Sequence, residues 1–461
     1  MIYDTGKYLV LNEPKELLLL SLFVVICVLW VYVFVMYFRS RSCTPGINSN
    51  QFYTTIKRTD KCHPKGTKIQ SSSVHNSLPF VSVIVPARNE EKHIHRCLLS
   101  LLTQDYPNFE IIVIDDNSTD NTLKTIENIK KVRSKILHMR LEERQLLSAE
   151  DKLKILSLTD KPHGWAGKTW ASEQGYLHSK GSILLFTDGD THYGRKDVIS
   201  LTMSYMQKQN LDVLTGIPST GKIHDFWSKT ILPLWVLVGV LFGVNNTADV
   251  NNPKSKFAYL MGSFFIIKRK VFEDIGTFES VREALQEDKA LGVRIKRRGY
   301  NMKIVRLSGM ISAVGSRGNI CALWHTIGRT FAPLIVKNKV KVVANLLIIF
   351  LVSFIPFVIL PFSFLSTVKE QTFFFTSAIS MLILWVNIVC CLIAIIATAI
   401  IGVKEYRLAP IYSSLSFLAA IFLIVDCTYN ILPLLLFNKT MPIMWRGRKY
   451  IYKKEQEGFS I

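Results

Sequence analysis

The chain has 461 residues, of which 49% are hydrophobic, and its 56 Lys and Arg outnumber its 35 Asp and Glu, giving a formal net charge of +21. This apolar content excludes a disordered chain, and the length exceeds that of one minimal domain. The basic excess requires an acidic partner, such as nucleic acid, anionic lipid head groups or a phosphorylated substrate.

The first predicted element is an apolar segment at residues 17–38. It is long enough to cross a bilayer core of about 30 Å at a rise of about 1.5 Å per residue. Arg39 and Arg41 follow it directly, and no small-residue cleavage site ends it, so residues 1–38 are predicted to hold a retained membrane anchor. The basic flank predicts that the following residues lie in the cytoplasm, beginning with a basic linker at residues 39–78.

Residues 79–330 have a globular composition, and apolar strand patterns alternate there with helical patterns. Strands are predicted at residues 81–85, 110–114, 182–186 and 212–216, and helices at residues 90–102, 121–132, 168–179 and 195–208. Buried strands that alternate with helices predict an α/β fold with a parallel sheet covered on both faces. In such a sheet, ligands bind at the carboxyl ends of the strands.

Three polar clusters directly follow predicted strands. They are Pro86-Ala87-Arg88-Asn89-Glu90, Asp115-Asp116-Asn117-Ser118-Thr119-Asp120 and Thr187-Asp188-Gly189-Asp190. Asp and Asn at a strand end commonly form turns or helix caps, but capping does not need this much carboxylate. Crowded carboxylates repel one another unless a cation or a donor-rich ligand balances them. The spacing of Asp188 and Asp190 suits a hard divalent ion that takes its other ligands from phosphate and water, with a structural turn as the alternative.

A fourth acidic element, Glu287-Asp288, begins a predicted amphipathic helix with Leu291 and Ile295 on one face. Acidic residues in a first helical turn are favoured by the positive end of the helix dipole. A carboxylate at this place could instead be the general base for an acceptor hydroxyl. The residues by themselves leave both interpretations open.

The end of the globular region is followed by predicted C-terminal membrane helices at residues 331–438, in apolar runs near 341–362, 373–402 and 411–437. If all three runs crossed the membrane, the chain would have four spans with the anchor. The basic tail at residues 439–461 would then lie on the other side of the membrane from the globular region, against the positive-inside rule. We therefore predict that one late run is re-entrant or interfacial and that the tail is cytoplasmic. The stretch 231–244 is too short to span comfortably and is predicted to be an interfacial or core helix.

The order of motifs resembles inverting glycosyltransferases of family 2, which have a GT-A fold. These motifs are PARNE, IVIDDNSTD, FTDGD and QED before a helix that ends RRGY, and they lie within about residues 78–310. The segment GWAGKTWA at residues 164–171 is similar to one in hopanoid-associated and carotenoid glycosyltransferases, and MWRGRKY at residues 444–450 is similar to the ending of that subgroup. The layout of anchor, catalytic domain and apolar tail is also similar to that of ceramide glucosyltransferases.

The resemblance implies a role for each polar cluster. The residues that would shape the nucleotide pocket are Pro86, Arg88, Asn89 and Glu90, and those that would contact base and ribose are Asp115 and Asp116. Asp188 and Asp190 would hold Mg²⁺ or Mn²⁺ on the diphosphate. Lys168 would touch the diphosphate as a point charge, with a solvated lysine as the alternative. Asp288, supported by Glu287, would deprotonate the acceptor.

Processive members of the family carry a Q-x-x-R-W motif after the acidic element, whereas this chain has WHTIGR at residues 324–329. The departure argues against a polymerase and for the transfer of a single sugar. The residues predicted to contact the acceptor or the diphosphate are Trp324, Arg329, Trp445, Arg446 and Arg448. The stretch FAYLMGSFF at residues 257–265 resembles the acceptor-side loop of the family, with a core strand as the alternative.

The sequence therefore predicts a membrane-bound, metal-dependent hexosyltransferase with a cytoplasmic catalytic domain. It would transfer one sugar, from a UDP-sugar in preference to a GDP-sugar, to a lipid acceptor with inversion. One alternative is a polyprenyl-phosphate glycosyltransferase, and another is a catalytically inactive membrane scaffold that keeps the fold. Nucleic acid is not an expected partner, because it would fit the charge but not the membrane segments.

Overall fold

The computed structural model describes residues 14–47, 78–139, 152–221, 223, 225–241, 246–284, 286–313, 339–371 and 378–415, together with parts of 418–425 and residues 442–445 and 448–451. The chain separates into two compact units. The helical unit comprises Met1–Ser40, Ile223–Asn246 and Ser316–Glu455, and the sheet unit comprises Arg41–Lys222, Thr247–Gly315 and Gln456–Ile461. Residues 48–77 of the predicted linker lie outside the described part of the chain.

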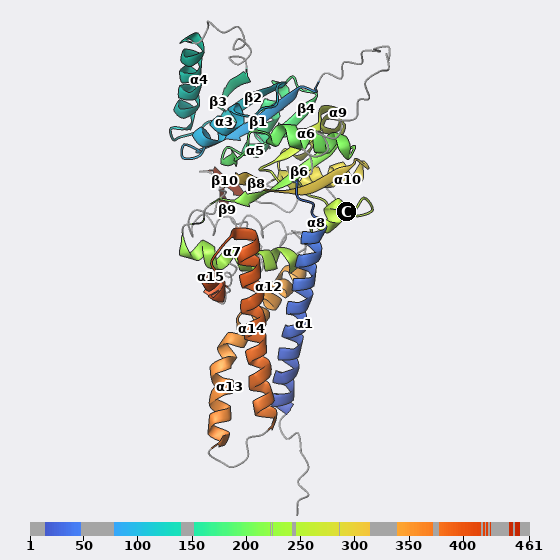
Figure 1. Cartoon of the computed structure of the whole chain (residues 1–461), viewed down its shortest axis with the longest axis vertical. Coiled ribbons are helices and arrows are strands. Elements are labelled where there is room, and N and C mark those ends of the chain that lie inside the picture. Colours follow the sequence, from blue (N-terminus) through green and yellow to red (C-terminus); the bar gives the residue numbers. More distant parts are fainter. Residues whose placement is uncertain are drawn as a thin grey trace, which may run out of the picture. The chain divides into compact units, whose positions relative to one another are not determined.

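The sheet unit is built on an eight-stranded sheet with the order β3-β2-β1-β4-β7-β6-β8-β5 (Figure 1). Its strands are β1 (Val81–Ala87), β2 (Phe109–Asp116), β3 (Leu153–Leu158), β4 (Ile183–Phe186), β5 (Thr191–Tyr193), β6 (Val213–Thr220), β7 (Phe265–Lys268) and β8 (Met302–Ala313). The pairs formed by β3, β2, β1 and β4 are parallel, as predicted. Strand β7 is antiparallel to both β4 and β6, and β5 is antiparallel to β8. The prediction of a wholly parallel sheet is therefore wrong, and the sheet is mixed.

Alternate residues of the strands supply two apolar cores, one on each face of the sheet. In β1, Val81, Val83 and Val85 belong to one core and Ile84 belongs to the other. The first core is covered by α3 (Ile94–Leu102), α4 (Thr122–Met139) and α6 (Val198–Lys208). The second is covered by α5 (Gly167–Leu177), α9 (Arg269–Asp274) and α10 (Glu287–Arg297), with the 3-10 turn Glu279–Val281.

Strand β7 is antiparallel to its neighbours, so the loop before it, and not the loop after it, lies at the carboxyl edge of β4. Its first residue, Phe265, pairs with Phe186, the last residue of β4. An antiparallel strand begins where its neighbour ends, so the segment before β7 arrives at the edge where β4 stops. Residues 257–264 are therefore a loop at this edge, and only Phe265 begins the strand.

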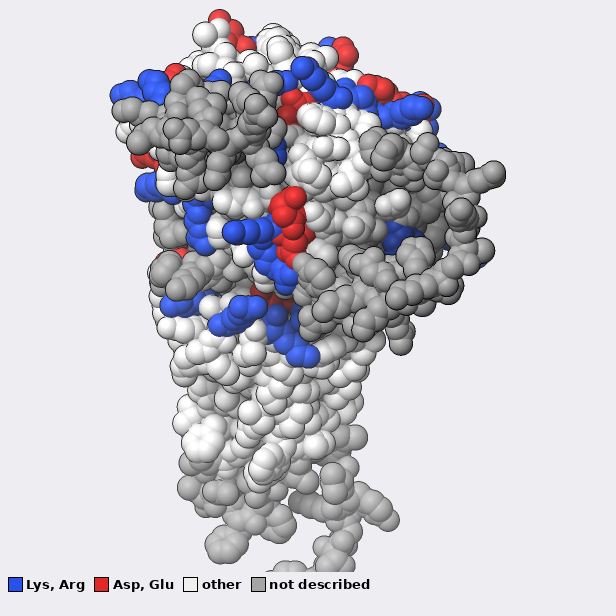
Figure 2. All heavy atoms as spheres, turned by 45° about the horizontal axis from the view of Figure 1, so that its top comes forward, with Lys and Arg blue, Asp and Glu red and all other residues white. Residues whose placement is uncertain are grey.

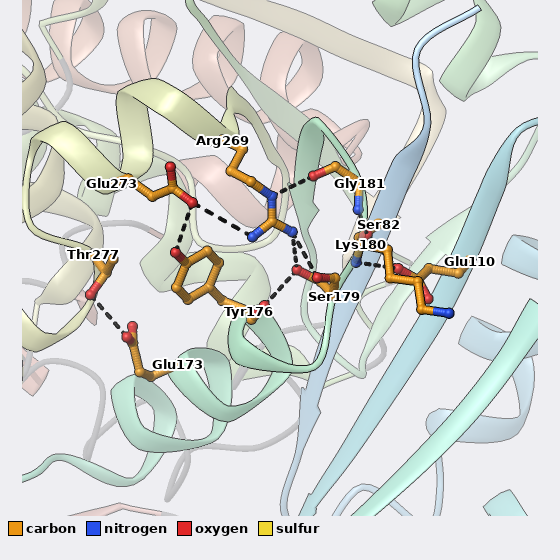
Figure 3. Close-up of polar contacts among 10 residues, drawn as sticks. All are labelled: Ser82, Glu110, Glu173, Tyr176, Ser179, Lys180, Gly181, Arg269, Glu273 and Thr277. Atoms are coloured by element: carbon orange, nitrogen blue, oxygen red, sulfur yellow. Dashed lines mark hydrogen bonds and ion pairs between the residues drawn. The ribbon is translucent and has the colours of Figure 1, made fainter.

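The opposite edge of the sheet, at the amino end of β4, holds a group of polar contacts around Arg269. We call it the Arg269 network and define it as Tyr176, Ser179, Gly181, Arg269 and Glu273 (Figure 3). Arg269 follows β7 directly and donates from Nε to the carbonyl of Gly181 at 2.6 Å and from Nη2 to that of Ser179 at 2.9 Å. Its guanidinium lies 5.1 Å from the ring centre of Tyr176, whose hydroxyl donates to Glu273 at 3.0 Å. These contacts fix the end of α5 to the sheet.

A short peptide after α1 (Pro14–Ser42) is part of the sheet unit. The amide of Ile47 donates to the carbonyl of Arg306 at 3.3 Å, and the amide of Arg306 donates to the carbonyl of Pro45 at 2.9 Å. Asn251, in α8 (Thr247–Asn251), donates from its side chain to the carbonyl of Cys43 at 2.9 Å. The residues that leave the first helix thus add to β8 and α8.

The helical unit contains three helices that are long and apolar enough to cross a membrane, at Leu17–Ser42, Val343–Leu365 and Ser380–Tyr406. Its helices are α1, α7 (Phe226–Leu241), α12 (Lys339–Ser353), α13 (Ile355–Gln371), α14 (Ala378–Tyr406) and α15 (Pro410–Ser414), and it includes the strand pair β9 (Pro442–Trp445) and β10 (Arg448–Ile451). Three of the predicted apolar runs therefore form long helices. Most of the fourth, at residues 411–437, lies outside the described residues.

The long helices are apolar on their exposed sides as well as inside. Phe23 and Trp30 of α1 are buried, yet Val28 on the same helix is 62% exposed, and Trp385 of α14 is 57% exposed. Figure 2 shows charged side chains gathered over the sheet unit, while the helical unit presents a mostly uncharged surface. A helix that is apolar all round is typical of a lipid environment.

The carboxyl ends of α1 and α14 lie side by side. The hydroxyl of Tyr37 donates to Glu405 at 2.6 Å, and Nζ of Lys404 lies 4.7 Å from the ring centre of Phe38. The two helices therefore run in the same direction. The stretch predicted to be an interfacial or core helix lies largely within α7, whose Ile231, Leu232 and Leu234 are buried in the apolar core of this unit.

Candidate functional site

Four charged side chains from distant parts of the sequence meet at the carboxyl edge of β4, and we call them the Lys168 cluster: Lys168, Asp188, Glu287 and Asp288. Nζ of Lys168 lies 2.7 Å from Oδ1 of Asp188 and 3.1 Å from Oε1 of Glu287. Lys168 is in the first turn of α5, Asp188 follows β4, and the two acidic residues begin α10. The cluster therefore joins the polar segment after β4 to the acidic element of α10, which the sequence could place only separately.

In the Lys168 cluster, one ammonium has three carboxylates near it. Burial by itself would lower the pKa of Lys168, but the negative charges of Asp188, Glu287 and Asp288 outweigh it and raise this pKa well above its ordinary value. The lysine is therefore protonated at neutral pH. A group of carboxylates of this kind could bind a cation or a ligand rich in hydrogen-bond donors.

The loop before β7 lies against this cluster, and a side chain at residue 262 would displace the Lys168 ammonium from its present position. A Cβ on Gly262 would lie 2.7 Å from Nζ of Lys168 and 3.6 Å from Oδ2 of Asp288. The loop is also held to α10, because the amide of Leu260 donates to the carbonyl of Asp288 at 3.1 Å. Gly292 permits the same close approach, since its Cβ would lie 2.7 Å from Cα of Tyr259.

The segments after β1 and β4 also converge. A Cβ on Gly189, between the two aspartates, would lie 3.3 Å from Cγ of Glu90. The buried thiol of Cys97 lies 3.6 Å from the carbonyl oxygen of Asp188. Burial raises the pKa of this thiol, and the charges of Asp190, Glu90 and Asp188 raise it further. Asp190 is buried, whereas the side chain of Asp188 is 31% exposed.

The segments after β1 and β2 are tied to each other by reciprocal hydrogen bonds. Arg88 donates from Nη1 to the carbonyls of Asp116 and Asn117, the latter at 2.7 Å. The amide of Asn89 donates to the hydroxyl of Ser118 at 3.1 Å, and the side-chain oxygen of Asn89 accepts from the amide of Thr119 at 2.9 Å. These bonds hold two loops in one arrangement, so that Arg88 and Asn89 shape this edge through backbone contacts.

The helix predicted from residue 90 begins later, at Ile94, because the preceding backbone amides bind another loop. The amide of Glu90 donates to the hydroxyl of Thr122 at 2.7 Å, and the amide of Glu91 donates to Oδ2 of Asp120 at 3.2 Å. These two amides bind the segment after β2. Residues 90–93 are therefore turns that join the two loops.

The last two residues of β2, Asp115 and Asp116, are buried aspartates. Oδ2 of Asp115 accepts from the amide of Ser118 at 3.2 Å, but its buried Oδ1 has no hydrogen-bond partner among the described residues. Asp115 and Asp116 are 2% and 4% exposed. A buried acceptor without a donor is costly, so the hydroxyl groups of a bound ribose would relieve it. Pro86 lies beside these residues, because it pairs with Ile114 in the strand ladder.

The structure allows a test of the predicted metal site by the chemistry of its donors. Within the described part of the chain, no group of three or more His, Cys, Asp or Glu residues is placed to hold a metal ion. Asp188 and Asp190 offer carboxylate oxygens, which are the ligands that Mg²⁺ and Mn²⁺ prefer. A divalent ion fits these residues when further oxygen ligands come from a bound phosphate and from water. Oδ1 of Asp188 is paired with Lys168 in this structure.

Several predicted contacts cannot be placed. Trp324, Arg329 and Arg446 lie outside the described residues. Trp445 and Arg448 have a described backbone, in β9 and β10, but no described side chain. Their contact with an acceptor or a diphosphate stays a prediction.

Sequence reasoning also missed two residues that the structure places at this edge. Gly262 is part of a longer aromatic stretch, and a glycine there is a signal for a close backbone approach. Cys97 lies in the middle of an apolar helical pattern, and nothing in the sequence distinguishes it from a core residue.

Comparison with known proteins agrees with this geometry. Residues 82–276 match the model of the family described as Glycosyl transferase family 2. The chain is 24% identical to the beta-monoglucosyldiacylglycerol synthase of Nostoc sp. over 263 residues, which cover 56% of this chain and 49% of that protein. It is 25% identical to the 4,4'-diaponeurosporenoate glycosyltransferase of Staphylococcus aureus over 229 residues, which cover 49% of this chain and 53% of that protein. The chain spans about half the length of the curated relatives it matches.

A solved structure shares the fold. The mannosyltransferase PcManGT from Pyrobaculum calidifontis, determined in complex with GDP-Man and Mn²⁺, superposes with a TM-score of 0.50 at 15% identity. The match covers 91% of this chain and 99% of that chain. At this level of identity the likeness concerns the fold.

Proposed function

Residues 82–276 are a family 2 glycosyltransferase domain with a GT-A fold, and we propose that the chain transfers a single sugar from a nucleotide sugar to a lipid acceptor with inversion. The observation that carries this proposal is the Lys168 cluster. It brings Asp188, on the side of the predicted nucleotide pocket, into one charged group with the acidic residues of α10. A transferase needs donor and acceptor groups within reach of one reacting carbon.

The donor half of the proposed site is formed by the segments after β1, β2 and β4. Buried Oδ1 of Asp115 has no hydrogen-bond partner among the described residues, which supports a role in binding base or ribose. Lys168 offers a positive charge for the diphosphate. Mg²⁺ or Mn²⁺, held by Asp188 and Asp190, would stabilise the negative charge that develops on the leaving diphosphate. We propose a UDP-sugar as donor, with a GDP-sugar as the alternative.

The acceptor half is formed by the start of α10 and the loop at residues 257–264. Asp288 is proposed to be the general base, with Glu287 beside it. The backbone amide of Lys289 donates to Oδ1 of Asp288 at 2.8 Å, and a Cβ on Gly262 would lie 3.6 Å from Oδ2. Asp288 would take the proton of the acceptor hydroxyl while its oxygen attacks the anomeric carbon opposite the leaving diphosphate. One displacement of this kind inverts the configuration.

A lipid acceptor is proposed from the three apolar helices and from the relatives, since one is named as a synthase of monoglucosyldiacylglycerol. Because α1 and α14 are parallel, they support a topology in which the span between them, Val343–Leu365, crosses the membrane once in the opposite direction. The residues that follow α1 and those that follow α14 would then lie on the same side. Arg39 and Lys404 mark this side as basic, and we propose that it is the cytoplasm.

The test is a transfer assay with the full-length protein in lipid nanodiscs that contain a bacterial lipid extract. UDP-glucose, UDP-N-acetylglucosamine and GDP-mannose would be supplied separately with Mn²⁺, and the lipids analysed by mass spectrometry. We expect one donor to give a lipid heavier by a single hexose or N-acetylhexosamine. A lipid phosphate as the glycosylated product would favour the polyprenyl-phosphate alternative. Failure to form any glycosylated lipid, with nucleotide still bound, would favour the inactive scaffold.

A further inference from the structure

We infer that Lys168 is an internal counter-ion that competes with the divalent cation for Asp188, so that cation and nucleotide diphosphate bind cooperatively. In the donor-free enzyme the ammonium would occupy Asp188 and keep cation affinity low. This inference rests on the proposed function, because it assumes a nucleotide diphosphate as the ligand that draws the lysine away.

The first support is the geometry of the ion pair. Oδ1 of Asp188 lies 2.7 Å from the lysine Nζ, which is the distance of a charge-assisted hydrogen bond. A divalent ion bound to the same oxygen would place its charge close to the ammonium, and two positive charges at such a separation repel strongly. The ammonium must therefore move, or the cation must bind weakly.

The second support is that the lysine backbone is held in place. Thr169, the next residue, donates from its hydroxyl to the carbonyl of Arg282 at 2.8 Å. Further along α5, Glu173 accepts from the hydroxyl of Thr277 at 2.9 Å, and the Arg269 network closes the end of the helix (Figure 3). With both ends of α5 fixed, the ammonium can leave Asp188 only by rotation of its own side chain.

The third support is the limited space around the ammonium. The loop backbone at Gly262 lies so close that an added Cβ would be 2.7 Å from Nζ. On another side Glu287 holds Nζ at 3.1 Å. A diphosphate beside Asp188 would offer the ammonium a new anionic partner, so donor binding supplies the energy that moves the lysine and opens Asp188 to the cation.

The wild-type protein provides the first experiment. The affinity for Mn²⁺ would be measured by electron paramagnetic resonance of free Mn²⁺, on the full chain in detergent, with and without UDP or GDP. We expect Mn²⁺ to bind more tightly by about tenfold or more when a nucleotide is present. Equal affinity in both conditions would overturn the inference.

Variants of the lysine provide the second experiment. Lys168→Met removes the charge at similar length, and we expect its affinity for Mn²⁺ without nucleotide to rise by about tenfold. Lys168→Arg keeps the charge and should retain weak binding. Lys161→Met is the matched control, because Nζ of Lys161 donates to the carbonyls of Trp165 and Pro162, outside the cluster. Unchanged or weaker Mn²⁺ binding by folded Lys168→Met would contradict the competition.

The two proposals fail in distinguishable ways. If the wild type forms a glycosylated lipid and binds Mn²⁺ with nucleotide, but Lys168→Met leaves donor-free Mn²⁺ affinity unchanged, then only the counter-ion role is wrong. If no protein binds Mn²⁺ even with nucleotide, the metal-dependent mechanism and the counter-ion role are both wrong. Asp188→Asn in the Lys168→Met background should abolish the gained affinity, which would assign it to Asp188.

Discussion

The two edges of the sheet each carry one central cation, but the cations have different surroundings. Arg269 donates to backbone and hydroxyl oxygens of Ser179 and Gly181, lies over the ring of Tyr176 and has one acidic neighbour, Glu273. Lys168 has three carboxylates around it. The first cation is held mainly by neutral oxygens, whereas the second has acidic side chains from two separate segments around it. Charged groups that gather in this way are more typical of a binding site than of a structural contact.

Of the changes that would test this comparison of the two edges, a substitution of Asp288 is expected to have the largest effect on catalysis. Asp288→Asn should lower the turnover number for sugar transfer by about 10²–10⁴-fold, because the acceptor would lose its general base. Nucleotide affinity should stay within about twofold, since the donor groups are intact. Asp274→Asn, which alters an aspartate paired with Arg298, is the control. Survival of transfer in Asp288→Asn would remove this residue from the mechanism.

A second large effect is expected at Asp190. Asp190→Asn should weaken Mn²⁺-dependent nucleotide binding by about a hundredfold, because one of two carboxylate ligands is lost. The wild type should lose activity in chelator and regain it when Mn²⁺ is added. Nucleotide binding would be measured by titration calorimetry, with Asp212→Asn, on the opposite edge, as the control. Full activity in chelator would exclude a role for the metal.

A moderate effect is expected at Gly262. Gly262→Ala would push Lys168 from its place, and kcat/KM for the donor should fall by about ten- to a hundredfold. The melting temperature should barely change, since only a side-chain tip must move. Gly46→Ala is a matched control, because no atom lies within 4 Å of the Cβ that it would add. Unaltered kinetics in Gly262→Ala would show that the lysine position is not critical.

The smallest effect on catalysis is expected at the edge that holds the Arg269 network. Arg269→Met should lower the stability of the sheet unit by about 2–3 kcal/mol, because the oxygens that accept from the guanidinium would lose their donor. The turnover number at a temperature well below the melting point should stay within about twofold of the wild type. Thermal unfolding followed by tryptophan fluorescence would measure the loss. A variant of ordinary stability but poor turnover would show that the two edges are not separate.

The fold and the site could be predicted to different extents. The strands that the sequence predicted are all present, because each is a short apolar run next to turn residues, and their polar ends predicted the donor segments. Strands β3, β5, β7 and β8 of the large sheet and the pair β9 and β10 were missed. Strand β3 carries Lys154 within its apolar pattern, β5 has three residues, and no local pattern shows that β7 runs backward.

The pairing of Lys168 with Glu287 could not be predicted either. The two residues are 119 positions apart, and each has a local explanation: Glu287 as an acidic residue in a first helical turn and Lys168 as a solvated lysine. Only the packing of α5 and α10 on one face of the sheet brings them together. The position of Gly262 depends on the same packing, since the reversed strand carries its loop to the cluster.

The antiparallel direction of β7 also separates the proposed donor residues from the proposed acceptor residues along the sequence. Every segment assigned to the nucleotide sugar ends before residue 191, and the segments assigned to the acceptor begin at residue 257. A crossover placed between them, in α6 or β6, could therefore recombine the donor choice of one such enzyme with the acceptor choice of another. Homologous exchange would keep both sets of groups on a single sheet edge, so new pairs of donor and acceptor could arise by shuffling gene segments.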